Sequence, residues 1–523
     1  MGDTLLPFLV AFCLIACLIV LIGRTVNWVW LKPKKTEKLL REQGFNGNPY
    51  KMLHGDTKEM GAMIKEAYSK PIKLCDDIVP RVLPFQHHLI NKYGEKTFFW
   101  VGPIAKVLIT NPELIQEILT KNSVFKKPIP NPLVKFIVAG LAGYEDEKWT
   151  KHRKIVTPAF YLEKLKNMVP AMYISCNEMI KKWEILMLQT ENKNSVELDV
   201  QPYLETLTSD VICRTTFGNS HSQGSKIFQL QKQQAELTGQ VLKSVYVPGW
   251  RFLPTKRNRK MHQINNELRA LFKEIITEKE TAMKLGKAKD DNLLSMLLKS
   301  NLKETQEQGQ KHGLSIDEVI ENCKTFYFAG QESTSNLLSW TMFCLSVHPS
   351  WQARAREEIL QAFGSKIPDY DGLNRLKIVT MILYEVLRLY SPSVMFTRIV
   401  YKETKLGDIV LPPGVQLMLP VLYVHRDPKL WGEDSKDFNP ERFAQGIANA
   451  TKNQLCFFPF SWGPRICVGN NFALMEAKLA LTMILRHFEF QLSPSYIHAP
   501  SFVVTHKPQH GVHIILHTVS KSN

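Results

Sequence analysis

The pattern of hydrophobic and polar positions separates an apolar N-terminal run from a long mixed part. Leu5 to Ile22 contains no charged residue, and its length is close to the roughly 20 residues that span a bilayer. An acidic residue precedes the run, whereas Arg24 and several lysines follow it. A cleaved signal peptide, the alternative, would have a basic start and a small-residue cleavage site. The pattern therefore predicts an uncleaved membrane anchor over residues 1–30, with Trp28 and Trp30 at the membrane surface.

The remaining chain is predicted to form a short hinge and one large domain. Residues 31–49 are basic and contain proline, glycine and asparagine, which makes a continuous helix into the domain improbable. From residue 50 to residue 523 there is no repeat, low-complexity tract or linker long enough to separate domains. The stretch from Gly286 to Gly313 is rich in Lys, Asp and Gln, and we interpret it as an exposed connection inside this domain.

Periodicity predicts a mainly α domain with small β sheets near the chain ends. Phe98 to Val101 and Lys106 to Thr110 are typical of paired strands, and Asn111-Pro112 predicts the start of a helix. The longest predicted helix extends from Ser315 to Pro349 and opens with an S-x-x-E capping-box pattern. Its crowded apolar positions indicate a helix buried through the middle of the domain.

A polar segment, Ala329 to Thr334, interrupts this apolar helix. Gly330 costs on the order of 1 kcal/mol relative to alanine inside a helix, and Glu332 is costly to bury without partners. One interpretation is a polar turn where the helix reaches the surface. The other is a local opening of the helix that presents the Glu332 carboxyl and the Ser333 hydroxyl to a reacting ligand.

Near the C-terminus, Cys467 lies in a loop between two glycines, directly before a helix that Asn470 and Asn471 can cap. The free N–H groups and the dipole at a helix start lower a thiol pKa and favour the thiolate, the form that binds metal. Gly469 allows the backbone to approach a flat ligand closely, and Arg465 can pair with an anion on it. A lone cysteine is more often a small buried hydrophobic residue, so the residue type alone does not identify a metal site.

Composition and charge limit the kinds of partner that the protein is expected to bind. Lys plus Arg minus Asp plus Glu is 66 − 49 = +17. No nucleic-acid-binding motif accompanies this charge, so an anionic membrane face or an acidic protein is the expected counterpart, and no nucleic acid is expected. The nine cysteines include no C-x-x-C pair, which disfavours a zinc site or a disulfide scaffold and favours a reducing compartment.

Four motifs together resemble the cytochrome P-450 family, the haem-thiolate monooxygenases. The segment from Phe460 to Gly469 matches the cysteine-ligand loop, F-x-x-G-x-R-x-C-x-G, at every fixed position. Ala329 to Ser333 is similar to the oxygen-activating segment A-G-x-[D/E]-T, with Ser333 where the family usually has threonine. The E-x-x-R pattern that begins at Glu385 and the P-E-R-F pattern that contains Arg442 follow in the family order. The resemblance covers essentially the whole chain.

The resemblance implies a set of site residues. Haem b (iron protoporphyrin IX) is expected as the cofactor and Cys467 as its iron ligand, while His425 is interpreted as an ordinary histidine. The W-x-x-x-R pair of Trp149 and Arg153, in isolation a surface pair, would bind a haem propionate. The full expected set is Trp149, Arg153, Arg398, Phe460, Arg465 and Gly469 for the cofactor, Glu332 and Ser333 for proton delivery, and Glu385, Arg388 and Arg442 as an ion-pair triad bracing the cysteine loop.

The resemblance also implies an activity: insertion of one oxygen atom from O2 into a C–H bond of an apolar substrate. Electrons would come from NADPH through a separate NADPH–cytochrome P-450 reductase, because the chain has no G-x-G-x-x-G unit or flavin domain. Asn48 to Asp56 and Trp149 to Phe160 look like the plant secologanin-synthase-like group, which favours a terpenoid substrate. The expected location is the endoplasmic reticulum membrane, single-pass, with the catalytic domain in the cytosol.

Two alternatives to this activity stay open: a haem-thiolate isomerase or dehydratase that needs no reductase, and a membrane-anchored haem- or lipid-binding protein without turnover. Tyr246 to Pro254 is either a packed loop or, as we slightly favour, a segment that dips into the membrane surface. The substrate pocket is expected to draw on the long helix and on Phe125 to Gly143, Val241 to Tyr246, Val394 to Thr397 and the segment near Phe502.

Overall fold

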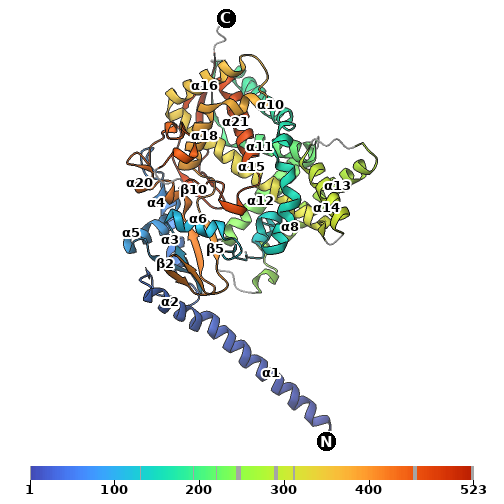
Figure 1. Ribbon diagram of the computed structural model, residues 1–523, viewed down its shortest axis with the longest axis vertical. Helices are drawn as coiled ribbons and strands as arrows, with labels where there is room; N and C mark the ends of the chain where they lie inside the picture. Colours follow the sequence, from blue (N-terminus) through green and yellow to red (C-terminus); the bar gives the residue numbers. More distant parts are fainter. Residues whose placement is uncertain are drawn as a thin grey trace.

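The computed structural model describes residues 2–129, 131–191, 194–218, 221–242, 249–287, 292–309, 312–451 and 456–519. A mainly helical body carries small sheets, and the N-terminal helix α1 (Gly2–Val26) projects away from it (Figure 1). The fold class expected from the sequence is therefore confirmed. All nine cysteines are free thiols.

The N-terminal helix continues past the position where the sequence predicts a break. A π-helical segment (Asn27–Leu31) joins α1 to α2 (Lys32–Glu42), so the predicted interruption at residues 31–42 is wrong. The wider π turn accommodates the ring of Pro33, which would otherwise clash with the carbonyl four residues earlier. That carbonyl, on Val29, instead accepts a 2.6 Å hydrogen bond from the Tyr50 hydroxyl. The helix from Pro7 to Glu42 is long and apolar enough to cross a membrane.

The two larger sheets of the described residues are a mixed five-stranded sheet and an antiparallel three-stranded sheet. The five-stranded sheet has the order β1-β2-β3-β8-β5 and the three-stranded sheet the order β4-β12-β9. The predicted strand pair is confirmed as the antiparallel β2 and β3. The strands are β1 (Asn46–Gly47), β2 (Thr97–Val101), β3 (Ile104–Leu108), β4 (Ser195–Asp199), β5 (Phe396–Ile399), β6 (Thr404–Leu406), β7 (Ile409–Leu411), β8 (Gln416–Leu419), β9 (Phe488–Leu492), β10 (Pro500–Phe502), β11 (His506–Pro508) and β12 (His513–Thr518).

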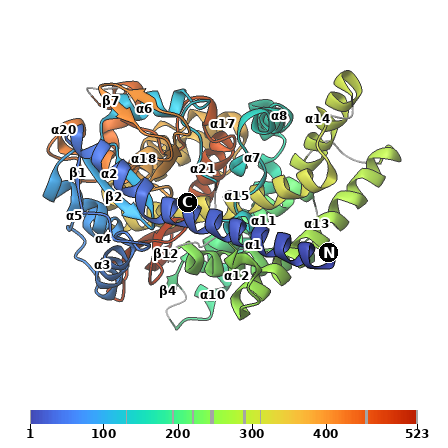
Figure 2. The ribbon, with the colours of Figure 1, turned by 90° about the horizontal axis from the view of Figure 1, so that it is seen from below.

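The helices form the bulk of the body. They are α3 (Thr57–Ser69), α4 (Val79–Val82), α5 (Pro84–Tyr93), α6 (Pro112–Thr120), α7 (Gly140–Gly143), α8 (Asp146–Val156), α9 (Leu162–Lys166), α10 (Val169–Leu188), α11 (Gln201–Phe217), α12 (His221–Leu242), α13 (Lys256–Lys284), α14 (Leu293–Gln308), α15 (Ile316–Val347), α16 (Pro349–Phe363), α17 (Tyr370–Arg375), α18 (Lys377–Leu389), α19 (Val421–Val424), α20 (Pro428–Trp431) and α21 (Asn470–His487). Asn111 caps α6, as predicted. In both ribbon views α15 lies near the middle, with α11 and α21 close by (Figures 1 and 2).

Helix α15 is the predicted long helix, and it is continuous. Ser315 caps it, and Ser315 and Glu318 form the predicted capping box. The helix also runs unbroken through Ala329 to Thr334, so neither a surface turn nor a local opening is present there. A Cβ at Gly330 would lie 2.9 Å from Ile212 Cδ1. The glycine therefore permits close packing of α11 on α15, which explains its presence without an opening of the backbone.

The stretch from Gly286 to Gly313 is not simply an exposed connection, which corrects the interpretation of its composition. Within its described part lies α14, whose first half is buried, including Leu293 and Leu297. Asn292 caps this helix by accepting a hydrogen bond from the Ser295 N–H. The apolar cluster at residues 293–298 is the signal for a buried helix, and the polar residues around it obscured that signal.

Candidate active site around Cys467

The loop that carries Cys467 is folded tightly on itself. The Cys467 N–H donates to the Phe460 carbonyl at 2.9 Å. Gly463 has φ = +68°, and a Cβ there would lie 2.8 Å from the Leu119 carbonyl oxygen, so only glycine fits. Helix α21 then begins with Gly469 at its N-cap position. The predicted capping by two asparagines is wrong, because Asn470 is already the first helical residue.

Cys467 opens into a cavity of about 340 Å³ between this loop and α15. Its side chain is exposed, but the exposed surface faces the cavity wall rather than bulk water. The lining residues used below are Lys127, Trp149, Arg153, Ser333, Thr334, Phe460, Arg465 and Gly469. A volume of this size lies within the range of small-molecule and cofactor sites.

The electrostatics of Cys467 differ from the simple expectation. Burial raises the pKa of Cys467, whereas the Gly469 N–H and the positive charges of Arg153 and Lys127 act to lower it. Burial outweighs them, so the expected net lowering by the helix start does not occur in the protein alone. The groups that would stabilise a thiolate are nevertheless directed at the sulfur, as a sulfur ligand to a metal requires.

Three cations, Lys127, Arg153 and Arg465, line the cavity near the sulfur, and a fourth, Arg398, lies close enough to act on Lys127 without lining the cavity. Burial lowers the pKa of Lys127 to about 7, with further contributions from Arg465 and Arg398. Burial likewise lowers the pKa of Arg398 and of Arg465 to about 10. Within the described residues, no carboxylate forms an ion pair with Lys127, Arg153 or Arg398. Such concentrated, uncompensated positive charge fits a ligand that carries carboxylates of its own.

Helix α8 fixes the cysteine loop through the predicted W-x-x-x-R pair. Arg153 Nη1 donates to the Ile466 carbonyl at 2.8 Å. The Arg465 guanidinium lies 4.5 Å from the centre of the Trp149 ring and pairs with the Glu145 carboxylate. Arg398 is the exception among the predicted cofactor residues, because it does not line the cavity. Its Nη1 donates to the carbonyl of Thr397.

Helix α15 presents two hydroxyls to the cavity but not the predicted acid. Ser333 Oγ donates to the Ala329 carbonyl at 2.7 Å. Thr334 Oγ1 is buried and has no hydrogen-bond partner among the described residues. Glu332 points elsewhere: its Oε1 accepts a 2.8 Å hydrogen bond from Thr505 Oγ1. Ser333 therefore lines the cavity, as expected, whereas Glu332 does not line it.

Two residues of the wall, Lys127 and Thr334, lie in segments that the sequence pointed to, but sequence reasoning gave neither of them a role of its own. Lys127 comes two residues after the buried Phe125. Lys126, between them, forms an isolated bridge with Ile399, and this bridge holds the segment against β5. A lysine so close to an apolar anchor is a weak signal in the sequence. Thr334 was visible as a second hydroxyl beside Ser333, but its orientation depends on how α15 packs.

The ion-pair triad is buried beside the cysteine loop. Arg388 makes a two-pronged contact with Glu385, at 2.8 Å from Nε to Oε2 and 2.7 Å from Nη2 to Oε1. Both side chains have 0% exposure. Arg442 Nε lies 3.5 Å from Glu385 Oε1, so the structure brings all three predicted residues together. The paired geometry and its carbonyl partners offset the cost of burying these charges.

His425 connects the triad to the loop. Arg388 Nη1 donates to the His425 carbonyl at 2.8 Å. On the other side, His425 Nε2 accepts a 3.2 Å hydrogen bond from the Phe458 N–H, just before the loop. Burial lowers the pKa of His425 to about 3, with Arg388 adding to the effect, so the ring is neutral and can accept. His425 is thus a core histidine, as the sequence indicated.

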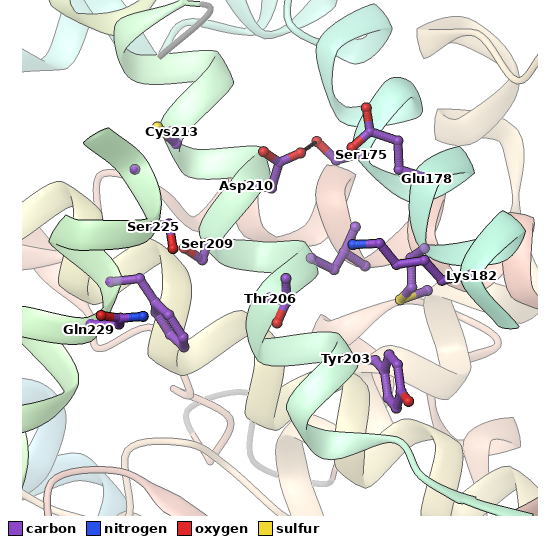
Figure 3. A pocket seen from close by; sticks show the side chains of 14 residues that line it. Ser175, Glu178, Lys182, Tyr203, Thr206, Ser209, Asp210, Cys213, Ser225 and Gln229 are labelled. Atoms are coloured by element: carbon purple, nitrogen blue, oxygen red, sulfur yellow. Dashed lines mark hydrogen bonds between the residues drawn. The ribbon is translucent and has the colours of Figure 1, made fainter. Parts of the chain in front are cut away.

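A second cavity, of about 430 Å³, lies between α10, α11 and α12, and no residue of the Cys467 loop lines it (Figure 3). Both carboxylates that line it, Glu178 and Asp210, already have partners. Asp210 accepts hydrogen bonds of 2.6 Å from both Ser175 Oγ and Arg214 Nε, and Arg214 also donates to Glu178 at 2.9 Å. The smaller cavity at Cys467 is therefore the better candidate for the active site.

The predicted pocket segments contribute unevenly. The segment Phe125 to Gly143 contributes Lys127, Leu141 and Ala142 to the cavity wall, and the segment Val394 to Thr397 contributes Phe396. Phe502 does not line the cavity. Residues 243–246, and Tyr246 to Pro248 of the segment expected at the membrane surface, lie outside the described residues. The described remainder of that segment exposes Trp250, Phe252 and Leu253. Its insertion into a membrane stays a prediction.

Comparison with known proteins gives a consistent result. Residues 82–511 match the family model described as Cytochrome P450. The chain is 54% identical over 519 residues to a cytochrome P450 of Panax ginseng, covering 99% of this chain and 100% of the relative. It is 51% identical over 496 residues to secologanin synthase 1 of Catharanthus roseus, covering 94% of each. It is also 51% identical over 500 residues to 7-deoxyloganic acid hydroxylase of the same plant, covering 94% of this chain and 95% of the relative.

Proposed function

Because this chain belongs to the cytochrome P450 family of haem-containing oxidoreductases, we propose that it is a monooxygenase in which Cys467 is the iron ligand of a haem b. The observation that carries the proposal is the cavity at Cys467. One sulfur opens into it on one side, two hydroxyls of α15 on the other, and cations cluster beside the sulfur. This donor set fits a flat iron porphyrin with two propionates.

The residues around the cavity hold the cofactor in this proposal. Arg153, Arg398, Arg465 and Lys127 supply the charges that balance the propionates, and Trp149 supports Arg465. Phe460 and Gly469 form the wall next to the sulfur, where the small glycine leaves room for a flat ring. The triad of Glu385, Arg388 and Arg442 maintains the position of the loop through His425.

When bound, the haem supplies activation of O2, which lets one oxygen atom enter a C–H bond of the substrate. The chain's own residues orient the substrate, exclude bulk water and deliver protons. Ser333 Oγ, at the cavity wall, would donate a proton into the cavity, and Glu332 would supply the proton that Ser333 takes up in exchange. Ser333 replaces the more common threonine, so its hydroxyl is positioned without a β-methyl group.

We propose that the substrate is apolar and terpenoid. Support comes from the relatives named secologanin synthase and 7-deoxyloganic acid hydroxylase, and from the apolar side chains that share the cavity wall, among them Phe326, Leu337 and Phe472. Glu332 and Ser333 together favour oxygen activation over an isomerase or dehydratase reaction, which needs no proton delivery to oxygen.

We further propose that an NADPH–cytochrome P450 reductase supplies the electrons and that the net charge of +17 favours docking with an acidic partner. The apolar N-terminal helix would anchor the protein in the endoplasmic reticulum membrane with a single pass and the catalytic domain in the cytosol. The proposed division is an anchor over residues 1–30, a connecting segment over 31–49 and the catalytic domain over 50–523, with the helix reaching into the connecting segment.

A panel of terpenoids, titrated into purified holoprotein and followed by type I spectral shift, tests this function. The compound with the largest shift is then incubated with reductase, NADPH and O2. The proposal predicts substrate-dependent NADPH consumption and a hydroxylated product. Haem-loaded protein that binds terpenoids but consumes no NADPH in their presence would contradict the monooxygenase assignment.

A further inference from the structure

Thr505 binds the carboxylate of Glu332, and neither of these two residues lines the cavity at Cys467. It lies in the turn between β10 and β11, and its Oγ1 donates to Glu332 Oε1 at 2.8 Å. Asn336 Nδ2 donates to the same Thr505 oxygen at 3.0 Å. A hydroxyl has a single hydrogen. Since Asn336 occupies an acceptor site of the oxygen, that hydrogen is directed at Glu332, and Glu332 must be the acceptor.

Glu332 in this position has access to water. Its side chain is 17% exposed, and Lys507 Nζ, on a side chain that is 38% exposed, lies 3.8 Å from the same Oε1. Ser333, the next residue, faces the cavity instead. These two neighbours on one helix therefore have different surroundings: the hydroxyl lines the candidate active site, whereas the acid lies outside its lining and is partly exposed.

The turn that carries Thr505 is itself fixed by neighbouring elements. The Phe502 N–H donates to the Tyr68 hydroxyl of α3 at 2.8 Å, and Arg81 Nε donates to the Pro500 carbonyl at 2.9 Å. A Cβ at Gly239 of α12 would lie 2.6 Å from Val503 Cγ1. The position of the Thr505 hydroxyl is thus set by α3, α4, α12 and α15 together, which is what a positioning residue requires.

We propose that Thr505 is a positioning residue that holds Glu332 ready to collect a proton from water and releases it when it is protonated. This inference rests on the proposed role of Glu332 and Ser333. A hydrogen bond to a charged acceptor is roughly twice as strong as one to a neutral acceptor. Protonation of the carboxylate therefore weakens the contact with Thr505, and the neutral acid can turn toward Ser333.

The proton balance of this cycle is complete. A hydronium ion gives its proton to the Glu332 carboxylate and becomes water. The carboxylic acid then gives that proton to Ser333 Oγ while Ser333 gives its own hydrogen to the ligand in the cavity, so the hydroxyl is unchanged. Glu332 returns as a carboxylate to the hydrogen of Thr505.

The first test measures the contact itself in purified protein and needs no turnover. Thermal unfolding is compared for wild type, Thr505→Val, Glu332→Ala and the double variant. If the contact exists, the double variant loses less in Tm than the sum of the two single losses. Thr505→Ser, which keeps the hydroxyl, serves as the matched control and should retain the coupling. Additive losses would overturn the inference.

The second test measures proton delivery in the haem-loaded enzyme with reductase and the panel terpenoid that gives the largest type I shift. Thr505→Val should release several-fold more peroxide per NADPH than wild type and show an altered solvent isotope effect, and Thr505→Ser should restore both. Wild-type coupling in Thr505→Val beside impaired coupling in Glu332→Ala would overturn the role of Thr505 alone. Wild-type coupling in Glu332→Ala would instead overturn the relay proposed above.

Discussion

At the scale of single residues, the cavity wall combines hydroxyls that look alike in sequence but differ in their surroundings. Ser333 uses its hydrogen on the Ala329 carbonyl, while Thr334 Oγ1 is buried without a partner among the described residues. A buried, unsatisfied hydroxyl costs about 1–3 kcal/mol. Thr334 therefore looks less like a structural residue than like one whose partner is a bound molecule.

Replacing Thr334 by valine should stabilise the ligand-free protein. Valine has nearly the same shape and removes the unsatisfied hydroxyl, so the free energy of unfolding should rise by about 1 kcal/mol. Thr341 on the same helix is the matched control, because its hydroxyl donates to the Leu337 carbonyl at 2.7 Å and it is equally buried. Urea unfolding of both variants measures the difference. A loss of stability in Thr334→Val would mean that the hydroxyl has a partner.

Glu318 gives a residue-level prediction with a defined pH window. Burial raises the pKa of Glu318, but the Ser315 N–H and the nearby Lys148 and Lys151 outweigh burial and hold it at about 2, below its ordinary 4.5. A lowered folded-state pKa contributes stability that is present above pH 4.5 and lost as the pH falls toward 2. Glu318→Gln should therefore cost about 1 kcal/mol at pH 7. The difference from wild type should shrink between pH 4.5 and 2.5, and a difference independent of pH would contradict this.

At the scale of elements, the triad connects α18 to the cysteine loop, and we expect it to be the main contributor to the stability of that loop. Glu385→Ala leaves Arg388 buried and unpaired, which costs about 3–5 kcal/mol, and the variant should fail to retain haem. Glu441 is the control. It lies in the P-E-R-F motif beside Arg442 of the triad, but its ion pair with Arg354 is exposed. Glu441→Ala should change stability by less than about 1 kcal/mol. Chemical unfolding and the ratio of haem to protein after gel filtration measure both. Equal behaviour of the two variants would contradict a buried triad.

The sequence predicted elements well where local signals were strong. The capping box at Ser315, the cap at Asn111 and the strand pair β2–β3 all depend on neighbours within a few residues. It failed where packing decided the outcome. The helix passes Pro33 because Tyr50, far along the chain, satisfies the freed carbonyl. Gly330 indicated an opening, yet α15 stays continuous because Ile212 of α11 packs against that position.

In the candidate site, too, features that depend on local sequence were predicted and features that depend on packing were not. Motif spacing identified Cys467, Trp149 and Arg153, which line one cavity. Side-chain direction was not readable from spacing, so Glu332 was expected in the cavity although it faces Thr505. Lys127 was not identifiable as a site residue, because it reaches the cavity only through the bridge that its neighbour Lys126 makes with Ile399 of β5. Residue identity follows from local pattern, whereas orientation depends on contacts across the fold.

At the scale of the whole molecule, the N-terminal helix has two parts with different roles. α1 is exposed from Pro7 to Val26, whereas α2 buries Pro33 and Leu40 against the body. A variant lacking residues 2–26 should therefore leave the membrane fraction and keep its Tm. A variant lacking residues 2–42 should also lose stability, because it exposes the apolar surface that α2 covers. Membrane flotation and thermal unfolding separate the two effects. Equal Tm in both variants would contradict a docked α2.

The central claim is that the Cys467 sulfur binds the iron of a haem, and the ferrous–carbon monoxide absorption spectrum tests it most directly. Wild-type holoprotein should show the Soret band of a thiolate-ligated haem, and Cys467→Ala should lose it. Cys456→Ala, which removes a buried cysteine shortly before the loop, should leave the band unchanged. A Cys467→Ala protein that keeps haem with an unaltered ferrous–carbon monoxide spectrum would contradict the account.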